Sequence, residues 1–208
     1  MSQAKERPIL FSAPMVRAIL EGRKTVTRRA CKPQPSPNAH TTSAEGSPMT
    51  SWWETGKDIV RCPYGQPGDR LWVREAWQAD AQVNDVAPRE LSHGEPIQYP
   101  ADGASRQTGC SMITPGKTRP SIHMPRWVSR ILLEITDVRV ERLQEISRSD
   151  IRAEGLECPP ELASDDVSPN YRDWYPAAWR ELWESINGAD SWNSNPWVWV
   201  VEFKRVRT

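Results

Sequence analysis

The segment Glu21–Arg29, with the sequence EGRKTVTRR, places an amine, hydroxyl groups and further cations within nine residues. Lys24 closely follows Gly22 and precedes the hydroxyl residues Thr25 and Thr27. A neutral lysine can take the proton of a threonine hydroxyl and make it a nucleophile, provided that burial or neighbouring cations lower the pKa of the lysine. The three arginines of the segment would supply such cations. The segment therefore fits nucleophilic catalysis, and the plainer alternative is a basic turn that enters a strand.

Lys24 and Thr27 can act together only if the chain bends near them. In a regular strand, residues three apart point to opposite faces of the sheet. Gly22 makes a turn or bulge possible here, because glycine adopts backbone conformations that other residues avoid. A catalytic role for the pair thus requires an irregular start to the strand.

Glu154 is the second unusual residue. It lies in the last turn of a short helix that we expect to begin at Ser147 and to stop at Gly155. A carboxylate at the negative end of a helix dipole lowers the stability of the folded state by roughly 0.3–1 kcal/mol. A basic neighbour in space would offset that cost; the alternative is a solvated glutamate on an exposed helix.

The elements that must position these residues are a mixture of strands and helices. Apolar runs and alternation predict strands at Pro8–Phe11, Arg70–Trp77, Ile131–Val140 and Trp197–Phe203. Helical spacing and capping residues predict helices at Ala13–Leu20, Ser147–Gly155 and Asp173–Ile186, the last with a stripe formed by Trp174, Ala178, Leu182 and Trp183. Because strands and helices do not alternate regularly, we expect an α+β fold built on a mixed, barrel-like sheet.

Three long polar segments separate these elements: residues 33–67, 80–119 and 157–171. They lack sustained periodicity, and we expect them to be loop insertions. Loops beyond about 15 residues in a compact domain are usually functional or mobile, so these should fold over a site or become ordered with a ligand. The length of 208 residues favours one domain, spanning 1–208 with these insertions.

The charges cancel over the whole chain but not locally. Lysine plus arginine and aspartate plus glutamate each number 27. This balance excludes a polybasic protein that binds nucleic acid mainly through bulk charge. Residues 1–33 nevertheless carry a net charge of +6 and residues 153–191 a net charge of −7. The basic end could contact phosphate groups or nucleic acid, or it could attract the acidic segment.

The cysteines and histidines form no pattern typical of a metal site or a disulfide framework. The four cysteines lie far apart without C-x-x-C spacing, and the three histidines have no H-x-x-x-H spacing. We therefore expect no metal and no other cofactor. The apolar run Trp197–Val201 is far shorter than the about 20 residues that span a bilayer. We expect no membrane partner and a cytoplasmic protein.

Gly22, Lys24, Thr27 and Arg29 match the pattern G-x-K-x-x-[ET]-x-R, which resembles the signature of the ASCH domain family. Further segments resemble the longer ASCH proteins of bacteriophages and prophages: GDRLWVREAW, SIHMPRWVSRILLEITDVRVERL, IS-x-x-D-x-x-AEG and NPWVWVVEF. The resemblance implies a PUA-like mixed β-barrel and a location in the cytoplasm of a bacterial host cell.

The resemblance also implies an activity. Small bacterial ASCH proteins similar to this chain are amidohydrolases that remove the acyl group from N4-acetylcytidine. By the match of GRKTVTRR to their GRKT-x-T-x-R, Thr27 is implied to be the nucleophile or a water-orienting hydroxyl, and Lys24 its activator. Glu154 is implied to be the general acid or base that serves the leaving amine. Arg29, which ends the signature, is implied to bind the substrate, expected to be a modified nucleoside or nucleotide.

Aromatic and basic residues outside the signature are further candidates for substrate binding. Arg126 and Trp127 suit phosphate contact and base stacking. Trp52 and Trp53 lie in a polar segment, where they would form a lid over a base or anchor the loop. His123 is also a candidate, although histidine in a strand is more often structural.

Two alternatives to the amidohydrolase remain open. The basic N-terminal segment and the Trp-rich strands also fit an RNA-binding module without catalysis. Some ASCH relatives imply a ribonuclease instead, in which His123 would gain importance as a base or acid beside a 2′-hydroxyl.

Overall fold

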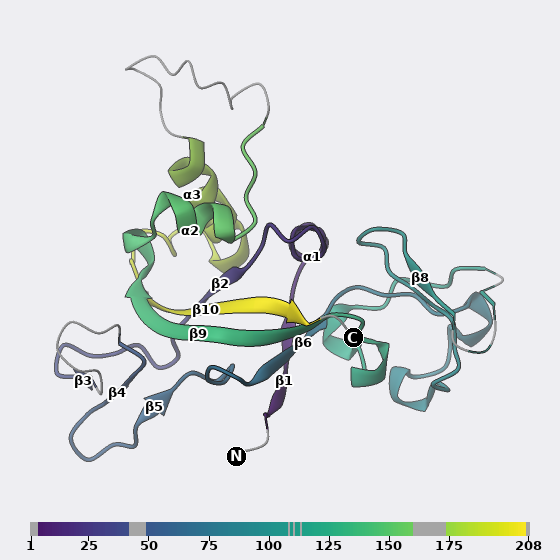
Figure 1. The fold of residues 1–208 in the computed structure, drawn as a ribbon, viewed down its shortest axis with the longest axis horizontal. Coiled ribbons are helices and arrows are strands. Elements are labelled where there is room, and N and C mark those ends of the chain that lie inside the picture. Colours follow the sequence, from purple (N-terminus) through teal and green to yellow (C-terminus); the bar gives the residue numbers. More distant parts are fainter. Residues whose placement is uncertain are drawn as a thin grey trace. The chain divides into compact units, whose positions relative to one another are not determined.

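A computed structural model describes residues 4–41, 49–107, 109, 111–112, 114–159 and 174–206. Its main feature is a mixed five-stranded sheet in the order β1-β6-β9-β10-β2 (Figure 1). These strands are β1 (Glu6–Leu10), β6 (Arg70–Arg74), β9 (Leu132–Arg142), β10 (Trp197–Val206) and β2 (Val26–Ala30). β1 pairs with β6 in parallel, whereas β6 with β9 and β10 with β2 are antiparallel.

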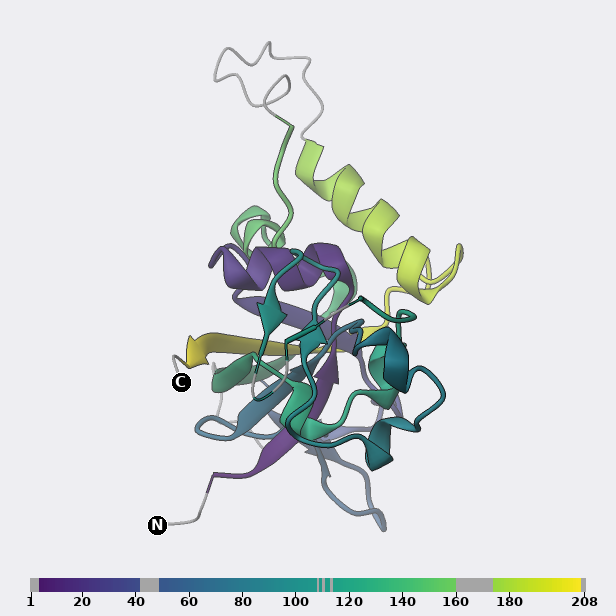
Figure 2. The same ribbon diagram turned by 90° about the vertical axis from the view of Figure 1, so that its right-hand side faces the viewer.

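The other elements are short strands, three helices and several 3-10 turns. Two small antiparallel sheets consist of β3 (His40–Thr41), β4 (Ser51–Trp53) and β5 (Val60–Arg61), and of β7 (Ile97–Gln98) and β8 (Ser105–Arg106). The α-helices are α1 (Ala13–Leu20), α2 (Arg148–Ala153) and α3 (Trp174–Asn187), the last being the longest helix in Figure 2. The 3-10 turns are η1 (Ala81–Val83), η2 (Pro88–Glu90), η3 (Ser121–His123), η4 (Arg126–Val128) and η5 (Leu143–Glu145).

The predicted α+β class is confirmed, but over the described residues the main sheet is not closed into a barrel. Closure requires the two edge strands to join the same hydrogen-bond ladder. The residues that lead into β2 pair instead with the end of α2: Thr25 N–H donates to the carbonyl of Ala153 at 2.8 Å, and Lys24 forms a bridge with Glu154. The approach to β2 is therefore paired with a helix end and not with a sixth strand.

The segments expected to be loop insertions contain short elements. β3, β4 and β5 lie within 33–67, and η1, η2, β7 and β8 lie within 80–119. Strands of two or three residues are too short to show an alternation of apolar and polar side chains, which is why the sequence did not reveal them. Of the third segment, residues 160–171 lie outside the described residues.

The chain divides into two compact units. Unit 1 comprises Met1–Glu21, Gly68–Ile135 and Lys204–Thr208, and unit 2 comprises Gly22–Pro67 and Thr136–Phe203. Each unit combines segments that are distant in sequence. That the chain is one domain spanning 1–208 stays a prediction.

The core of unit 2 packs one face of the sheet against α2 and α3. Val26, Val198 and Val200 contribute the sheet side of this cluster. The α3 side chains buried in it are Tyr175, Trp179 and Trp183, spaced four residues apart as on one helix face. Of the expected stripe of Trp174, Ala178, Leu182 and Trp183, Trp183 is buried in this cluster, and Trp174 and Leu182 pack at its margin as partly buried residues. The buried face is therefore centred on Tyr175, Trp179 and Trp183.

The opposite face of β10 is covered by an aromatic stack. Trp199 of β10 lies with its ring centroid 5.1 Å from that of Trp52 in β4, at an interplanar angle of 27°. Trp52 is only 1% exposed, whereas its neighbour Trp53 is 37% exposed and stacks on His40. Consecutive residues of a strand face opposite sides, so the two tryptophans have different environments.

The core of unit 1 surrounds Tyr99, whose hydroxyl donates to the carbonyl of Val128 at 2.7 Å. The Arg130 guanidinium lies 4.0 Å from the centre of the Tyr99 ring and forms hydrogen bonds with both carboxylate oxygens of Glu75 and of Asp102. Planar bidentate pairs of this kind hold arginine in a fixed orientation. No helix of the described residues is long and apolar enough to cross a membrane.

The contrast between the two neighbouring tryptophans can be measured. We expect Trp52→Ala to lower the free energy of unfolding by about 3–5 kcal/mol, because it leaves a cavity beside Trp199. Trp53→Ala is the matched control. It should lower the free energy of unfolding much less, since the Trp53 side chain is already in contact with water. Urea denaturation followed by far-UV circular dichroism measures both, and equal losses would contradict the packing described.

Candidate functional site

Lys24 and Glu154 meet at the outer edge of β2. The Lys24 ammonium donates to Glu154 Oε2 at 2.6 Å, to the backbone carbonyl of Glu154 at 2.9 Å and to the carbonyl of Val26 at 2.7 Å. Each of the two charged residues is 3% exposed. The amine is therefore held by three acceptors in a site that water barely reaches.

Local sequence signals bring Glu154 to this place. Ser147 caps the start of α2 by accepting a hydrogen bond from the backbone N–H of Asp150. Gly155 has a φ of +92°, a left-handed conformation that suits glycine and ends the helix immediately after Glu154. The Lys24 ammonium binds the carboxylate and the carbonyl at this helix end, so it is the basic neighbour that offsets the unfavourable position of Glu154.

Arg28 extends the site into a network of buried charges. Its side chain is fully buried and lies 2.6 Å from Asp150, 3.1 Å from Glu141 and 3.5 Å from Glu154. Buried charges require such partners, because removing an ion from water costs several kcal/mol. Arg28 and Lys24 thus share Glu154 between them.

Arg139 of β9 joins the same network. It forms ion pairs with Glu141, Asp150 and Glu202 and lies 3.5 Å from Asp137. Asp150 accepts from both Arg28 and Arg139, and so links α2 to β2 and β9. The sequence pointed to Arg28 only as a nearby cation and did not indicate the ion pairs of Asp150, because ion pairs between distant segments leave no local pattern.

Burial lowers the pKa of Lys24 below its ordinary value of 10.5. Loss of hydration is the main cause; the attraction of Glu154 opposes it, and the nearby charges of Arg29 and Arg28 reinforce it. A lysine of this kind gives up its proton more readily than one in water. It can then act as a base toward a neighbouring hydroxyl.

Thr27 is buried in β2 and pairs with Val201 of β10. It precedes Arg28 in the strand, so its side chain points to the face opposite the Arg28 network. Among the hydrogen bonds of the described residues, none joins the Thr27 hydroxyl to Lys24 or Glu154. The structure therefore unites two members of the expected catalytic set, whereas the third, Thr27, lies on the opposite face of β2.

Of the expected substrate-binding residues, Arg29, Trp52 and Trp53 belong to unit 2. Arg29 pairs across the ladder with Trp199, on the strand β2 that also carries Thr27. The Trp52 ring is already in contact with Trp199, whereas Trp53 is partly open to solvent. A substrate-binding role for these three residues stays a prediction.

The remaining candidates, His123, Arg126 and Trp127, belong to unit 1. His123 ends η3 and is exposed. Arg126 lies 2.9 Å from Glu6, and the Trp127 ring stacks on His93 with 4.9 Å between ring centroids. A role in substrate binding stays a prediction for these residues too.

Within the ranges that the structure describes, no three or more histidine, cysteine, aspartate or glutamate side chains are grouped so that they could hold a metal ion. The carboxylates around Lys24 are engaged with ammonium and guanidinium groups instead. The arrangement of Lys24 and Glu154 suits proton transfer to or from a bound molecule.

Comparison with known proteins identifies no family for the chain. No family model matches the sequence, and no curated protein matches it. The crystal structure of protein EF3133 from Enterococcus faecalis V583, of the family DUF984, aligns with 99% of this chain and 82% of that chain. The TM-score is 0.39 and the sequence identity 9%, so no conclusion is drawn from this likeness.

A double-mutant cycle tests the buried pair. We expect Glu154→Gln alone to lower the free energy of unfolding by about 3–5 kcal/mol, because it leaves the Lys24 ammonium buried without its counter-charge. The double variant Glu154→Gln with Lys24→Met should lower the free energy of unfolding by less than the sum of the decreases in the two single variants. Urea denaturation provides the three values.

The exposed pair formed by Lys57 and Glu54 offers a control, since the Lys57 side chain is 71% exposed. Lys57→Met should leave the urea midpoint unchanged. Strict additivity of the Lys24 and Glu154 variants would contradict the coupling that we describe.

Proposed function

We propose that the chain is an ASCH-type hydrolase with a PUA-like fold, which removes an acyl group from the exocyclic N4 of an acylated cytosine nucleoside. One observation carries the proposal: Lys24 and Glu154, 130 residues apart in sequence, are joined by a direct hydrogen bond. The two residues come from separate segments, each of which resembles a different part of the ASCH pattern. Their contact supports a shared role.

The reaction follows from the chemistry of the three residues. Neutral Lys24 takes the proton of the Thr27 hydroxyl, and the Thr27 oxygen forms a bond to the acyl carbon. The bond between that carbon and N4 breaks, and N4 receives a proton from the Lys24–Glu154 pair, which releases the free cytosine amine. Water then cleaves the Thr27 ester and restores the hydroxyl, with the acyl group leaving as a carboxylic acid.

The environment of Lys24 supports its part in this scheme. Its lowered pKa increases the fraction of neutral amine near neutral pH. The distance of 2.6 Å between Nζ and Glu154 Oε2 permits a proton to pass directly between the two groups. Productive binding requires a movement that brings the Thr27 hydroxyl within hydrogen-bond reach of Lys24.

A matched pair of variants tests the proposal. Thr27→Val keeps the size of the side chain but removes the hydroxyl, and it should reduce the conversion of N4-acetylcytidine to cytidine by about 100-fold or more. Thr27→Ser keeps the hydroxyl and should retain most of the activity. Mass spectrometry of the nucleoside products measures both.

The same preparation separates the alternatives. Absence of turnover with every N4-acylcytosine tested would refute the amidohydrolase. RNA binding that weakens steeply with salt and survives Thr27→Val would support the non-catalytic RNA-binding module. Cleavage of labelled RNA would support the ribonuclease.

A further inference from the structure

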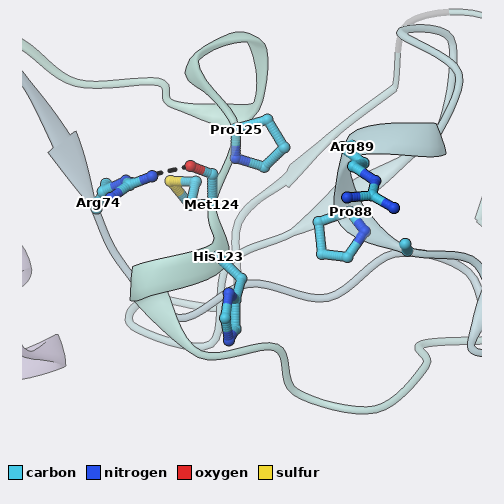
Figure 3. A pocket seen from close by; sticks show the side chains of 7 residues that line it. Arg74, Pro88, Arg89, His123, Met124 and Pro125 are labelled. Carbon is cyan, nitrogen blue, oxygen red and sulfur yellow. Dashed lines mark hydrogen bonds between the residues drawn. The ribbon is translucent and has the colours of Figure 1, made fainter.

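A pocket in unit 1 is lined by basic and apolar side chains only. Its walls are formed by Arg74, Ala87, Pro88, Arg89, His123, Met124 and Pro125 (Figure 3). The volume is about 390 Å³, within the range of about 300–1,000 Å³ that is usual for small-molecule sites. All seven residues belong to the Gly68–Ile135 segment of unit 1, which contains neither Lys24 nor Glu154.

Arg74 is fixed in this wall without a carboxylate partner. Its Nε donates to the carbonyl of Met124 at 3.2 Å, the bond drawn in Figure 3, and its guanidinium carbon lies 4.9 Å from the centre of the Trp72 ring. Among the ion pairs of the described residues, none involves Arg74. Because Nε is anchored, the two terminal nitrogens are held ready as a planar pair of donors.

The other basic groups lie around the same space. Arg89, whose side chain is 87% exposed, has only the exposed Glu90 as an ionic partner among the described residues, at 3.4 Å. His123 lies at a further wall, and Figure 3 shows it and Arg89 on different sides of the pocket from Arg74. The lining contains no acidic residue among those the structure describes. Such a site attracts an anion, and two guanidinium groups match the oxygens of a phosphate.

The apolar part of the wall indicates what the anion is attached to. Pro88 and Pro125 line the pocket with proline rings, and Met124 behind them is fully buried in the core of unit 1. The two proline rings suit contact with a flat apolar ring, because such contact removes apolar surface from water. A phosphate joined to a flat heterocyclic base meets both requirements.

We propose that this pocket binds the phosphate and base of a nucleotide, with Arg74 and Arg89 on the phosphate. The nucleotide is either a free nucleoside monophosphate or the phosphorylated end of a nucleic acid strand, which present the same chemistry. The pocket contains none of the residues of the proposed deacylation scheme, Lys24, Thr27 and Glu154, and the two arginines that carry this proposal are not among the expected substrate-binding residues of the hydrolase. His123 lines this pocket and acquires a role as a hydrogen-bonding residue for the ligand.

Isothermal titration calorimetry with AMP, adenosine and inorganic phosphate tests the site. Adenosine compounds are chosen because they are not products of the proposed deacylation. AMP should bind more tightly than adenosine or inorganic phosphate, since only AMP offers both the base and the phosphate. Arg74→Gln and Arg89→Ala should each weaken AMP binding by about tenfold or more, as expected for the loss of a charge-assisted hydrogen bond.

Arg180→Ala is the matched control, since Arg180 is a half-exposed arginine of α3 in unit 2. It should leave AMP binding unchanged. Arg89→Ala should leave the fold intact, because the side chain is largely in solvent. A loss of AMP binding in this variant therefore reports on the pocket and not on unfolding. Equal affinity for AMP and adenosine, or wild-type AMP affinity in both pocket variants, would overturn the proposal.

A short 5′-phosphorylated RNA distinguishes the two sources of the phosphate. Tighter binding of this RNA than of AMP, lost in Arg74→Gln, assigns the pocket to a strand end. Weaker binding of the RNA, with AMP binding retained, assigns it to a free nucleotide. The activity on N4-acetylcytidine should be the same in Arg89→Ala and in the wild type, so failure of one proposal is not mistaken for failure of the other.

Discussion

The arrangement of unit 2 depends on one buried ammonium group. An isolated charge removed from water costs several kcal/mol, and Lys24 is compensated by a carboxylate and two backbone carbonyls. Since these carbonyls belong to Val26 at the start of β2 and Glu154 at the end of α2, the same bonds fix where the helix ends beside the strand. The chemical site and the join between the two elements are therefore one structure.

This double role constrains any reaction at the site. Arg28 and Arg139 meet at Asp150, so a side chain from each of β2, β9 and α2 takes part in one ionic contact. Groups held in such a network are preorganised, which lowers the cost of reorganisation in a reaction, whereas Thr27 lies outside the network and would have to move. The helix α2 has only six residues, and both its first turn, through Asp150, and its C-cap, Glu154, are joined to the sheet by ion pairs.

Local signals predicted the parts of the structure that depend on neighbouring residues. Ser147 and Gly155 mark the limits of α2, and short strings singled out Lys24 and Glu154 as candidates, whose catalytic role stays a prediction. Contacts between distant segments could not be predicted in this way. The expectation of a closed barrel was wrong, because whether β2 pairs with a strand or with the end of α2 is decided by tertiary contacts, and the partners of Arg28 lie 113 to 126 residues away.

The bridge between Lys24 and Glu154 has a further consequence for the behaviour of the protein in solution. β2 is the last strand of its sheet, and an open strand edge is a template on which another chain can add by backbone hydrogen bonding. Here Lys24 and Thr25, the residues just before β2, pair with Glu154 and Ala153, and the buried Lys24 ammonium binds the Glu154 carbonyl beside them. The end of α2 thus covers the approach to this edge, which leaves less of it open to a strand of another chain.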